Sequence, residues 1–181
     1  MKGLEYIKTT RLVLRKPTTA DAKAIYTRYS SDTEVTKYVA WPRHQSIEQT
    51  RAFLAFSEAE WKRWPAGPYL IECQGDRRLL GGTGLAFETP TVAATGYVLA
   101  RDAWGHGYAT EALAAVVVVA RRLGVRRLYA LCHPHHQASI RVLEKCGFVR
   151  EELLAGFADF PNLGSGQREG CLRYVRVAGS E

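Results

Sequence analysis

The segment from Tyr97 to Leu123 constrains the fold of this chain most, because it combines a strand, a glycine-rich turn and a helix. Tyr97-Val98-Leu99 favours a β-strand, and two glycines follow in the sequence WGHGYA, where the chain must turn tightly. From Ala109 onward, apolar residues recur at the spacing of one helical face, at positions 109, 112, 113, 116, 117 and 120. Four successive valines at 116–119 are poor helix formers, so we expect a helix that is buried on more than one side and held by packing.

The turn before this helix is a candidate binding site for an anion. Backbone N–H groups in the first turn of a helix lack helical partners, and the positive end of the dipole favours a phosphate or pyrophosphate. An ordinary turn that uses glycine for tightness alone is the alternative, and both interpretations stay open. The Rossmann dinucleotide motif is excluded, because Thr110 stands where it needs glycine or alanine. The Gly-Lys-Ser/Thr of the NTPase phosphate loop does not occur in the chain.

The rest of the chain predicts a single domain at 1–181 with a mixed sheet and an α/β (α+β) fold. A chain of 181 residues is long enough for one well-filled core and short for two. Hydrophobic periodicity and turn residues predict the order β-α-α-β-β-β-α-β-α-β-β. The expected strands lie at 11–15, 69–73, 79–87, 92–99, 127–132, 148–155 and 171–177, and the expected helices at 19–30, 47–61, 109–123 and 137–146.

Composition and charge exclude several classes of protein. No apolar run approaches the roughly 18 residues of a membrane span. The N-terminal residues lack the apolar run of a signal peptide, so we expect a cytoplasmic protein with no membrane partner and four reduced cysteines. The net charge is +7, but the arginine pairs are dispersed and no aromatic-basic repeat occurs. Nucleic-acid binding is therefore not expected as the main function.

The sequence WGHGYATEAL resembles the acyl-CoA-binding motif of the GNAT N-acetyltransferase superfamily. It is most similar to the branch of ribosomal-protein N-terminal (alanine and serine) acetyltransferases, whose motif reads close to WGKGYATEAL. In the superfamily pattern Gln/Arg-x-x-Gly-x-Gly/Ala, Trp104 stands in the first position, and Gly107 and Ala109 fill the fourth and sixth. RLVLRKPTTADA and SIRVLEKCGF also resemble family segments, so the resemblance covers nearly the whole chain. It implies a mostly antiparallel sheet that splays at the cofactor cleft, with helices on both faces.

The resemblance implies transfer of an acetyl group from acetyl-CoA to a primary amine, on a protein or peptide N-terminus or on a small molecule. The amine would attack the thioester directly. The backbone N–H of Leu99 would bind the thioester oxygen, and the pantetheine arm would pair with Val98 and Leu99 like an added strand. The pyrophosphate would lie on the backbone of the turn, at Trp104, Gly105, His106, Gly107, Tyr108, Ala109 and Thr110.

A second segment, CHPHHQASIRVLEKCGF, resembles the family pattern His-Pro-Asp-Asn-x-x-Ser followed by a helix. Ser139 occupies the serine position, and the resemblance assigns it to protonation of the leaving thiolate. His136 replaces an asparagine that binds the pantetheine region or the substrate. An imidazole can donate one hydrogen bond while it accepts another, so His136 either replaces this contact in part or is a solvated residue at a helix start. The cysteine and histidines here lack zinc-site spacing, so no metal is expected.

The sequence does not identify a general base. Ala94 stands where many relatives carry glutamate, and Glu72 and Glu88 are the nearest acids upstream. Without a strong base, the site should favour α-amino groups, with a pKa of about 8, over lysine side chains at about 10.4.

Two other functions remain as alternatives to catalysis. A non-catalytic acyl-CoA-binding domain would bind the cofactor tightly without turnover of any amine. A basic nucleic-acid-binding protein would show steeply salt-dependent retention on DNA or RNA. The sequence leaves the acceptor open, and a homodimer stays among the expected assemblies.

Overall fold

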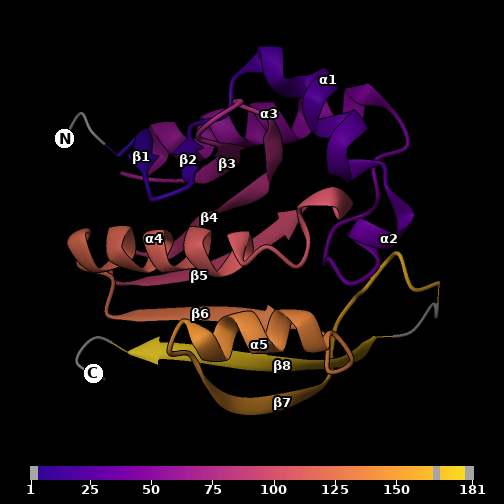
Figure 1. Cartoon of the computed structure of the whole chain (residues 1–181). Coiled ribbons are helices and arrows are strands. Elements are labelled where there is room, and N and C mark those ends of the chain that lie inside the picture. The colour runs from indigo at the N-terminus through magenta and orange to yellow at the C-terminus, as the bar shows by residue number, and fades with distance from the viewer. Residues whose placement is uncertain (1–3, 165–167, 178–181) are drawn as a thin grey trace.

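The computed structural model describes residues 4–164 and 168–177. Within these residues it contains one sheet of eight strands in the order β1-β2-β3-β4-β5-β6-β8-β7 (Figure 1). Each neighbouring pair is antiparallel except β5 and β6, which run parallel. The strands are β1 (Tyr6–Lys8), β2 (Leu12–Arg15), β3 (Pro68–Cys73), β4 (Leu79–Thr89), β5 (Val92–Leu99), β6 (Arg127–Cys132), β7 (Val149–Ala158) and β8 (Glu169–Val177).

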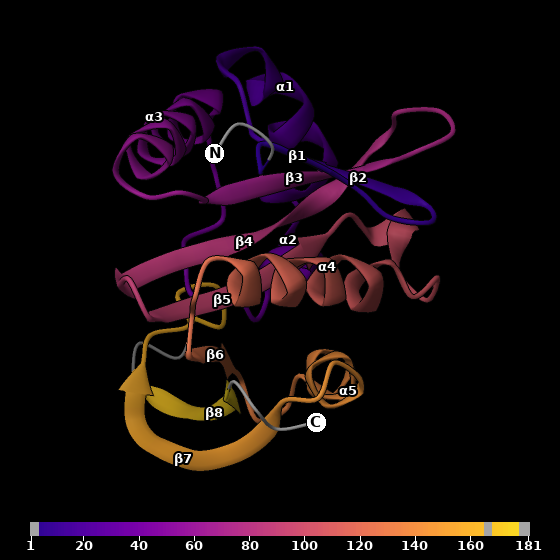
Figure 2. The same cartoon turned by 90° about the vertical axis from the view of Figure 1, so that its left-hand side faces the viewer.

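The helices cover both faces of this sheet, with α4 and α5 on one face and α1 and α3 on the other (Figure 2). They are α1 (Ala22–Ile25), α2 (Thr33–Thr36), α3 (Ile47–Arg63), α4 (Tyr108–Arg122) and α5 (Gln137–Lys145). A 3₁₀ turn precedes α1 at Thr19–Asp21, a π-helical turn follows it at Tyr26–Ser30, and a further 3₁₀ turn lies at Arg101–Ala103. In the described part of the chain, no helix is long and apolar enough to cross a membrane. The predicted mixed fold is confirmed.

Two short elements were missing from the predicted order. β1 spans three residues at the edge of the sheet and pairs with β2 alone, so it is too short for a detectable alternation. α2 begins shortly after the helix predicted at 19–30. The Asp32 carboxylate accepts hydrogen bonds from the backbone N–H groups of Glu34 and Val35 at 2.8 and 3.1 Å, and so acts as the N-cap of α2.

Helix α4 is held by packing, as the run of valines predicted. Leu113 and Val116 are fully buried in the core between α4 and the sheet. Burial does not extend around the whole helix, because Val118 is 49% exposed. The glycines of β4 allow a close approach of β5: a side chain on Gly81 would collide with the backbone carbonyl of Val98.

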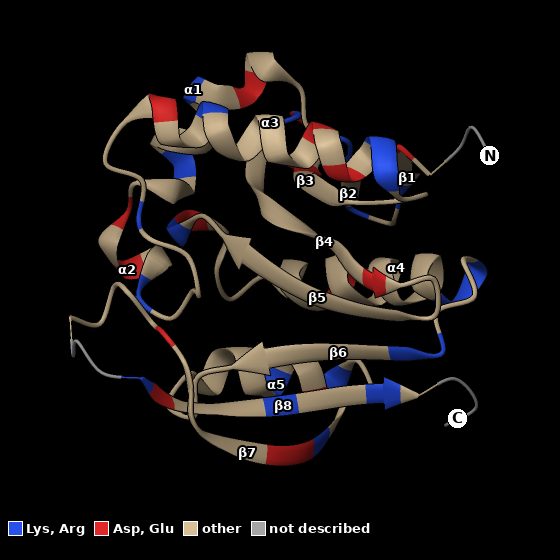
Figure 3. Cartoon of the chain, turned by 180° about the vertical axis from the view of Figure 1, so that it is seen from behind, with Lys and Arg blue, Asp and Glu red and all other residues tan. Residues whose placement is uncertain are grey.

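The sheet splays between its two parallel strands, as expected. β5 and β6 pair only from Val92 opposite Arg127 to Ala94 opposite Tyr129. Beyond this point both strands continue, and Figure 3 shows them separating towards their C-terminal ends. β6 instead pairs with β8 along its whole length. The sheet therefore consists of two parts that are joined at one end and open into a wedge at the other.

Candidate functional site

The glycine-rich turn enters α4 in the conformation that the anion-site interpretation requires. Gly105 and Gly107 have φ angles of 78° and 76°, in the left-handed region that favours glycine. Gly107 is the N-cap of α4, and its carbonyl accepts the first helical bond, from the N–H of Glu111 at 3.1 Å. The N–H groups of residues 108–110 precede this bond and point out of the first helical turn. Such groups at the positive end of a helix favour an anion.

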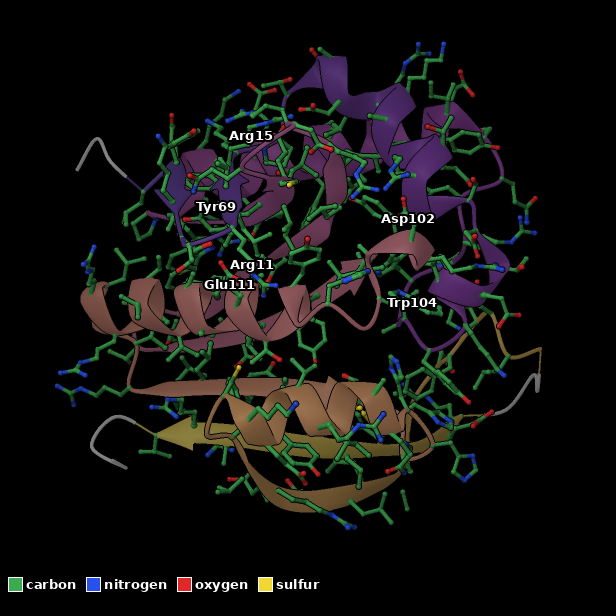
Figure 4. All side chains as sticks on the ribbon, viewed as in Figure 1. Arg11, Arg15, Tyr69, Asp102, Trp104 and Glu111 are labelled. Atoms are coloured by element: carbon green, nitrogen blue, oxygen red, sulfur yellow. The ribbon has the colours of Figure 1, made fainter. Side chains whose placement is uncertain are left out.

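A segment far away in the sequence holds this turn in place (Figure 4). Arg11, between β1 and β2, pairs with the Glu111 carboxylate at 2.7 Å and donates to the carbonyl of His106 at 2.8 Å. Thr9 also donates to Glu111, at 2.6 Å, and the Arg11 guanidinium lies 4.7 Å from the ring centre of Tyr108. Burial alone would raise the pKa of Glu111, but the hydrogen bonds from Thr9 and Arg11 lower it, so the carboxylate stays charged.

The 3₁₀ turn before the glycines is anchored by a second set of ion pairs. The Asp102 carboxylate, labelled in Figure 4, receives Arg28 at 2.8 Å and Arg78 at 2.9 Å. Arg101 pairs with Asp32 at 2.8 Å. Arg28 and Asp32 connect the turn to the segment around α1 and α2, and Arg78 connects it to the loop between β3 and β4. Both ends of the glycine-rich turn are therefore held by other parts of the fold.

The backbone of Leu99 faces the wedge. The N–H of Ala100 donates to the carbonyl of Leu80 at 2.7 Å, so Ala100 belongs to a hydrogen-bonded pair of the β4–β5 ladder. Since alternate residues of an antiparallel strand point their N–H and C=O groups to opposite sides, those of Leu99 point away from β4. The indole N–H of Trp104 confirms this direction by donating to the Leu99 carbonyl at 2.9 Å. The Leu99 N–H therefore points to the side that β6 has left.

Ser139 lies on the opposite wall of the wedge, in the first turn of α5, and Tyr97 of β5 reaches it. The Tyr97 hydroxyl is 2.8 Å from both the carbonyl oxygen and the Oγ of Ser139. The thiol of Cys132, at the end of β6, donates to the backbone carbonyls of His133 and His136 at 3.4 and 3.9 Å. Burial raises the pKa of this thiol to about 11, and burial also raises the pKa of Tyr97. All three groups are therefore neutral at pH 7.

His136 is not a solvated residue at a helix start. Its ring is partly buried and stacks on Tyr38, from the connector between α2 and α3, with 4.9 Å between ring centres. Burial lowers the pKa of His136, and the neighbouring His133 lowers it further, so the imidazole is neutral at pH 7. His133 also stacks on Tyr38, with 4.8 Å between ring centres, and its Nε2 lies 2.8 Å from the Glu169 carboxylate; we call Tyr38, His133 and His136 the aromatic cluster.

Asn162 connects two loops beside this cluster. Its Nδ2 donates to the backbone carbonyls of Thr36 and Trp41 at 2.7 and 2.9 Å. Its Oδ1 accepts from the backbone N–H of Arg43 at 2.7 Å. Three of the four hydrogen bonds that an asparagine side chain can form thus join the loop after β7 to the connector that carries Tyr38.

Comparison with known proteins identifies the family. A model of the acetyltransferase (GNAT) domain matches residues 11–149. The chain is 32% identical over 151 residues to YoaA of Bacillus subtilis, an uncharacterized N-acetyltransferase, which covers 82% of this chain and 85% of that one. The chain belongs to the GNAT acetyltransferase family. The family resemblance predicted from the turn motif is confirmed, and the relatives identify this GNAT protein as an enzyme of the acetyltransferase class.

Solved GNAT structures share the whole fold. An acetyltransferase from Bacillus anthracis superimposes with a TM-score of 0.81 at 26% identity, over 95% of this chain and 98% of that one. RimL, a ribosomal protein α-N-acetyltransferase solved in complex with coenzyme A, superimposes with a TM-score of 0.83 at 25% identity, over 96% and 98%. MccE, solved with acetyl-CoA and AMP, shares the fold at 20% identity with a TM-score of 0.82.

The GNAT fold brings some predicted site residues together and leaves others apart. Leu99 and Trp104 are hydrogen-bonded at the mouth of the glycine-rich turn, and Ser139 faces Tyr97 across the wedge. The two upstream acids are engaged elsewhere. Glu72 is 5% exposed and paired with Arg15, and Glu88 hydrogen-bonds Tyr129, where β5 and β6 are still paired. Among the described residues, no three His, Cys, Asp or Glu side chains form a group that could hold a metal.

Sequence reasoning missed several residues that shape this GNAT site: Arg11, Glu111, Tyr97 and Asn162. Arg11 and Glu111 are 100 residues apart, and the partners of Asn162 are more than 100 residues away, so no local pattern could reveal these contacts. Tyr97 sits in a strand that the sequence did predict. Its position next to the diverging parallel pair was the available signal, because a large side chain there must cross the wedge or fill it.

Proposed function

We propose that this GNAT protein transfers an acetyl group from acetyl-CoA to the nitrogen of a primary amine by direct attack on the thioester. The observation that carries the proposal is the Leu99 N–H, which faces the wedge a few residues before the turn with left-handed Gly105 and Gly107. A donor for a thioester oxygen and a site for a pyrophosphate thus lie next to each other in the chain. The bound coenzyme A of RimL supports the same use of the fold.

The cofactor would lie along β5 and end on α4. Its pantetheine arm would pair with the backbone of Leu99, as a strand added to the open side of β5, and would run past Val98, whose own carbonyl points towards β4. Its pyrophosphate would accept from the backbone of the turn, at Trp104, Gly105, His106, Gly107, Tyr108, Ala109 and Thr110. His136 and Ser139, on the opposite wall, would contact the cofactor near its sulfur.

The chemistry follows from these positions. A hydrogen bond from the Leu99 N–H polarises the thioester carbonyl and stabilises the charge that grows on its oxygen during attack. The amine nitrogen bonds to the carbonyl carbon, the carbon–sulfur bond breaks, and its electron pair leaves on the sulfur. The Ser139 hydroxyl would donate a hydrogen bond to that sulfur, and the proton that the amine nitrogen loses would pass to His136 or to water. A thiol pKa of about 8.5 makes thiolate a tolerable leaving group, so Ser139 assists without being indispensable.

The acceptor would approach from the side of the connector that carries Tyr38. A protein N-terminus and a small-molecule amine are both acceptors of this chemistry, and the names of RimL and its relatives support the first. His136 is a neutral side chain that could act as a base on this side, because burial lowers its pKa. We place this reaction in the cytoplasm, in a single domain spanning 1–181, with a homodimer as the assembly to test.

Calorimetric titration with coenzyme A tests the cofactor site. Gly107→Pro removes a backbone donor and cannot adopt a φ of 76°, so binding should be lost. Gly124→Pro is the matched control, because Gly124 has a φ of 80° at the opposite end of α4. It should lower the melting temperature and leave affinity intact. His106→Ala should bind normally, since the side chain is not the donor. Unchanged affinity in a folded Gly107→Pro protein would refute the assignment.

A further inference from the structure

The indole of Trp104 takes the place of a neighbouring strand at the end of β5. The ladder between β5 and β6 ends at Ala94 and Tyr129, and among the described residues no strand pairs with the wedge side of Leu99. The indole N–H of Trp104 donates to the Leu99 carbonyl at 2.9 Å. It therefore supplies the donor that a neighbouring strand supplies elsewhere in the sheet, and the Leu99 carbonyl is satisfied although the sheet has opened.

The segment after β5 folds back to bring this indole to Leu99. It forms the 3₁₀ turn at Arg101–Ala103, which the N–H of Trp104 closes by donating to the Arg101 carbonyl at 3.2 Å. Asp102 lies on the same turn and holds it through its two ion pairs with arginines (Figure 4). Trp104 is 47% exposed, so its ring is placed by the anchored turn and by the hydrogen bond to Leu99 rather than by core packing.

The N–H of Leu99 is fixed in direction because both peptide units that flank this residue are held. In the unit before it, the Val98 carbonyl points towards β4, so close to Gly81 that a side chain there would collide with it. In the unit after it, the N–H of Ala100 donates to β4 at 2.7 Å, and the Leu99 carbonyl accepts from Trp104. Loss of the indole donor would free one end of this second unit. The direction of the Leu99 N–H therefore depends on the side chain of Trp104.

We propose that Trp104 is a positioning residue whose indole N–H holds the Leu99 carbonyl, so that the Leu99 N–H points at the oxygen of the bound thioester. The inference rests on the proposed acetyl transfer, in which this N–H stabilises the charge that develops on that oxygen. The indole N–H also offsets the partial negative charge of the Leu99 carbonyl, which lies on the same edge of β5 as the developing charge. Trp104 thus acts on the thioester through Leu99. A displacement of about 1 Å near a reacting group can cost about 10²-fold in rate, so this contact affects catalysis.

The carbonyl stretching frequency of bound acetyl-CoA tests this without an amine acceptor. A hydrogen bond to the thioester oxygen weakens the C=O bond and lowers its infrared frequency, and an isotopic label on the acetyl carbonyl carbon separates this band from the protein amides. The frequency in the natural complex should lie below that of acetyl-CoA in water. Trp104→Phe keeps an aromatic ring and removes the indole donor, so it should raise the frequency towards the value in water.

Calorimetry gives a second readout, because coenzyme A lacks the thioester carbonyl. The ratio of the dissociation constants of coenzyme A and acetyl-CoA reports only on interactions of the acetyl group. This ratio should fall about threefold in Trp104→Phe, the effect of one neutral hydrogen bond, while the dissociation constant of coenzyme A stays nearly unchanged. Trp61→Phe is the matched control, because the Trp61 indole also donates to a strand carbonyl, that of Pro68 at 2.8 Å, away from the wedge. It should change neither readout.

A conservative variant separates the donor from the ring. The amide nitrogen of glutamine is the same number of bonds from Cβ as the indole nitrogen, so Trp104→Gln should return the frequency most of the way to the natural value. A frequency shift that Trp104→Gln does not reverse would assign the effect to the ring and overturn the inference.

The remaining outcomes distinguish this inference from the proposed acetyl transfer. A lowered frequency in the natural complex that is the same in Trp104→Phe would overturn the role of Trp104 and leave the proposed reaction standing. An equal shift in Trp61→Phe would also overturn it. If the natural protein does not bind acetyl-CoA, or binds it without lowering the carbonyl frequency, the proposed donor at Leu99 fails and both proposals are overturned.

Discussion

The guanidinium of Arg11 and the carboxylate of Glu111 lie 2.7 Å apart, although 100 residues separate them in the chain. Arg11 comes from the turn between β1 and β2, at one edge of the sheet, and Glu111 from the first turn of α4. The same arginine donates to the carbonyl of His106 in the glycine-rich turn. The edge hairpin therefore sets the shape of the turn proposed to bind the pyrophosphate.

Breaking this pair should weaken the proposed coenzyme A site. In Arg11→Ala the turn loses its contact to His106, and Glu111 keeps a charge at the positive end of α4 without its partner. We expect affinity for coenzyme A to fall about tenfold, the effect of one hydrogen bond to a charged group. Arg51→Ala is the control, because Arg51 pairs with Glu48 on the exposed surface of α3 at 3.1 Å. Calorimetry that finds equal affinities in the two variants would exclude this role for Arg11.

Removal of the Ser139 hydroxyl should slow turnover more than it weakens binding. Loss of a group that assists proton transfer commonly costs about 10²–10⁴-fold in rate. Because thiolate is a tolerable leaving group, Ser139→Ala should lower kcat by about 10²-fold or less. Its affinity for coenzyme A should be nearly unchanged. Steady-state kinetics combined with calorimetry checks both numbers. If affinity collapses while kcat survives, Ser139 is a contact of the cofactor and takes no part in departure of the sulfur.

The pH dependence of kcat/KM distinguishes a site that contains a general base from a site that contains none. The pKa of His136 is lowered, so its neutral form is complete at pH 7 and is lost as the pH falls through that lowered pKa. If His136 is the base, kcat/KM should show one fixed inflection below about 6.5, the ordinary value for histidine, with every acceptor. If no base acts, the inflection should follow the amine, near 8 for an α-amine and near 10.4 for lysine.

Placing an acid on β5 extends the same experiment. Ala94 stands beside Tyr129 at the last paired position of β5 and β6, where the wedge begins. If no resident base acts, Ala94→Glu should flatten the pH dependence and improve turnover of the more basic amines. A profile that stays the same for Ala94→Glu and changes for His136→Ala would assign the base to His136.

Substitution of Asn162 should weaken binding of the acceptor amine and leave binding of coenzyme A unchanged. Asn162→Ala removes three hydrogen bonds between the loop after β7 and the connector of Tyr38. We expect KM for the amine to rise about tenfold or more, with unchanged affinity for coenzyme A. Asn162→Asp keeps the acceptor for Arg43 but sets a carboxylate against two carbonyls, so it should restore nothing. A rise in the coenzyme A dissociation constant would show that the hydrogen bonds of Asn162 stabilise the whole fold and not the acceptor side alone.

Local patterns in the sequence predicted most of this fold. The helical spacing from Ala109, the glycines at 105 and 107 and the β-favouring run before them gave the central unit with boundaries within a residue or two. The short elements β1 and α2 were not predicted, because they contain too few residues to show a periodic pattern of apolar residues. Asp32 gives no local signal of a new helix, since the residue types that cap a helix also occur where a helix ends.

The candidate site was predictable where it consists of backbone and unpredictable where it depends on distant side chains. The glycine-rich turn follows from turn chemistry and Leu99 from the family resemblance, and both lie in one continuous segment. The contacts of Arg11, Tyr97 and Asn162 arise only when strands far apart in the chain become neighbours. A burial environment such as that of His136 likewise depends on Tyr38, almost 100 residues earlier in the chain.

Turnover of amines with acetyl-CoA tests the central claim most directly. The natural protein is incubated with acetyl-CoA and a panel of peptides with free N-termini, polyamines and antibiotics, and free coenzyme A and acetylated amine are quantified together. The account predicts release of coenzyme A that requires an amine, one acetylated amine for each thiol, and loss of both products in Gly107→Pro. Saturable binding of acetyl-CoA without acetylation of any amine would contradict it and identify a binding domain instead.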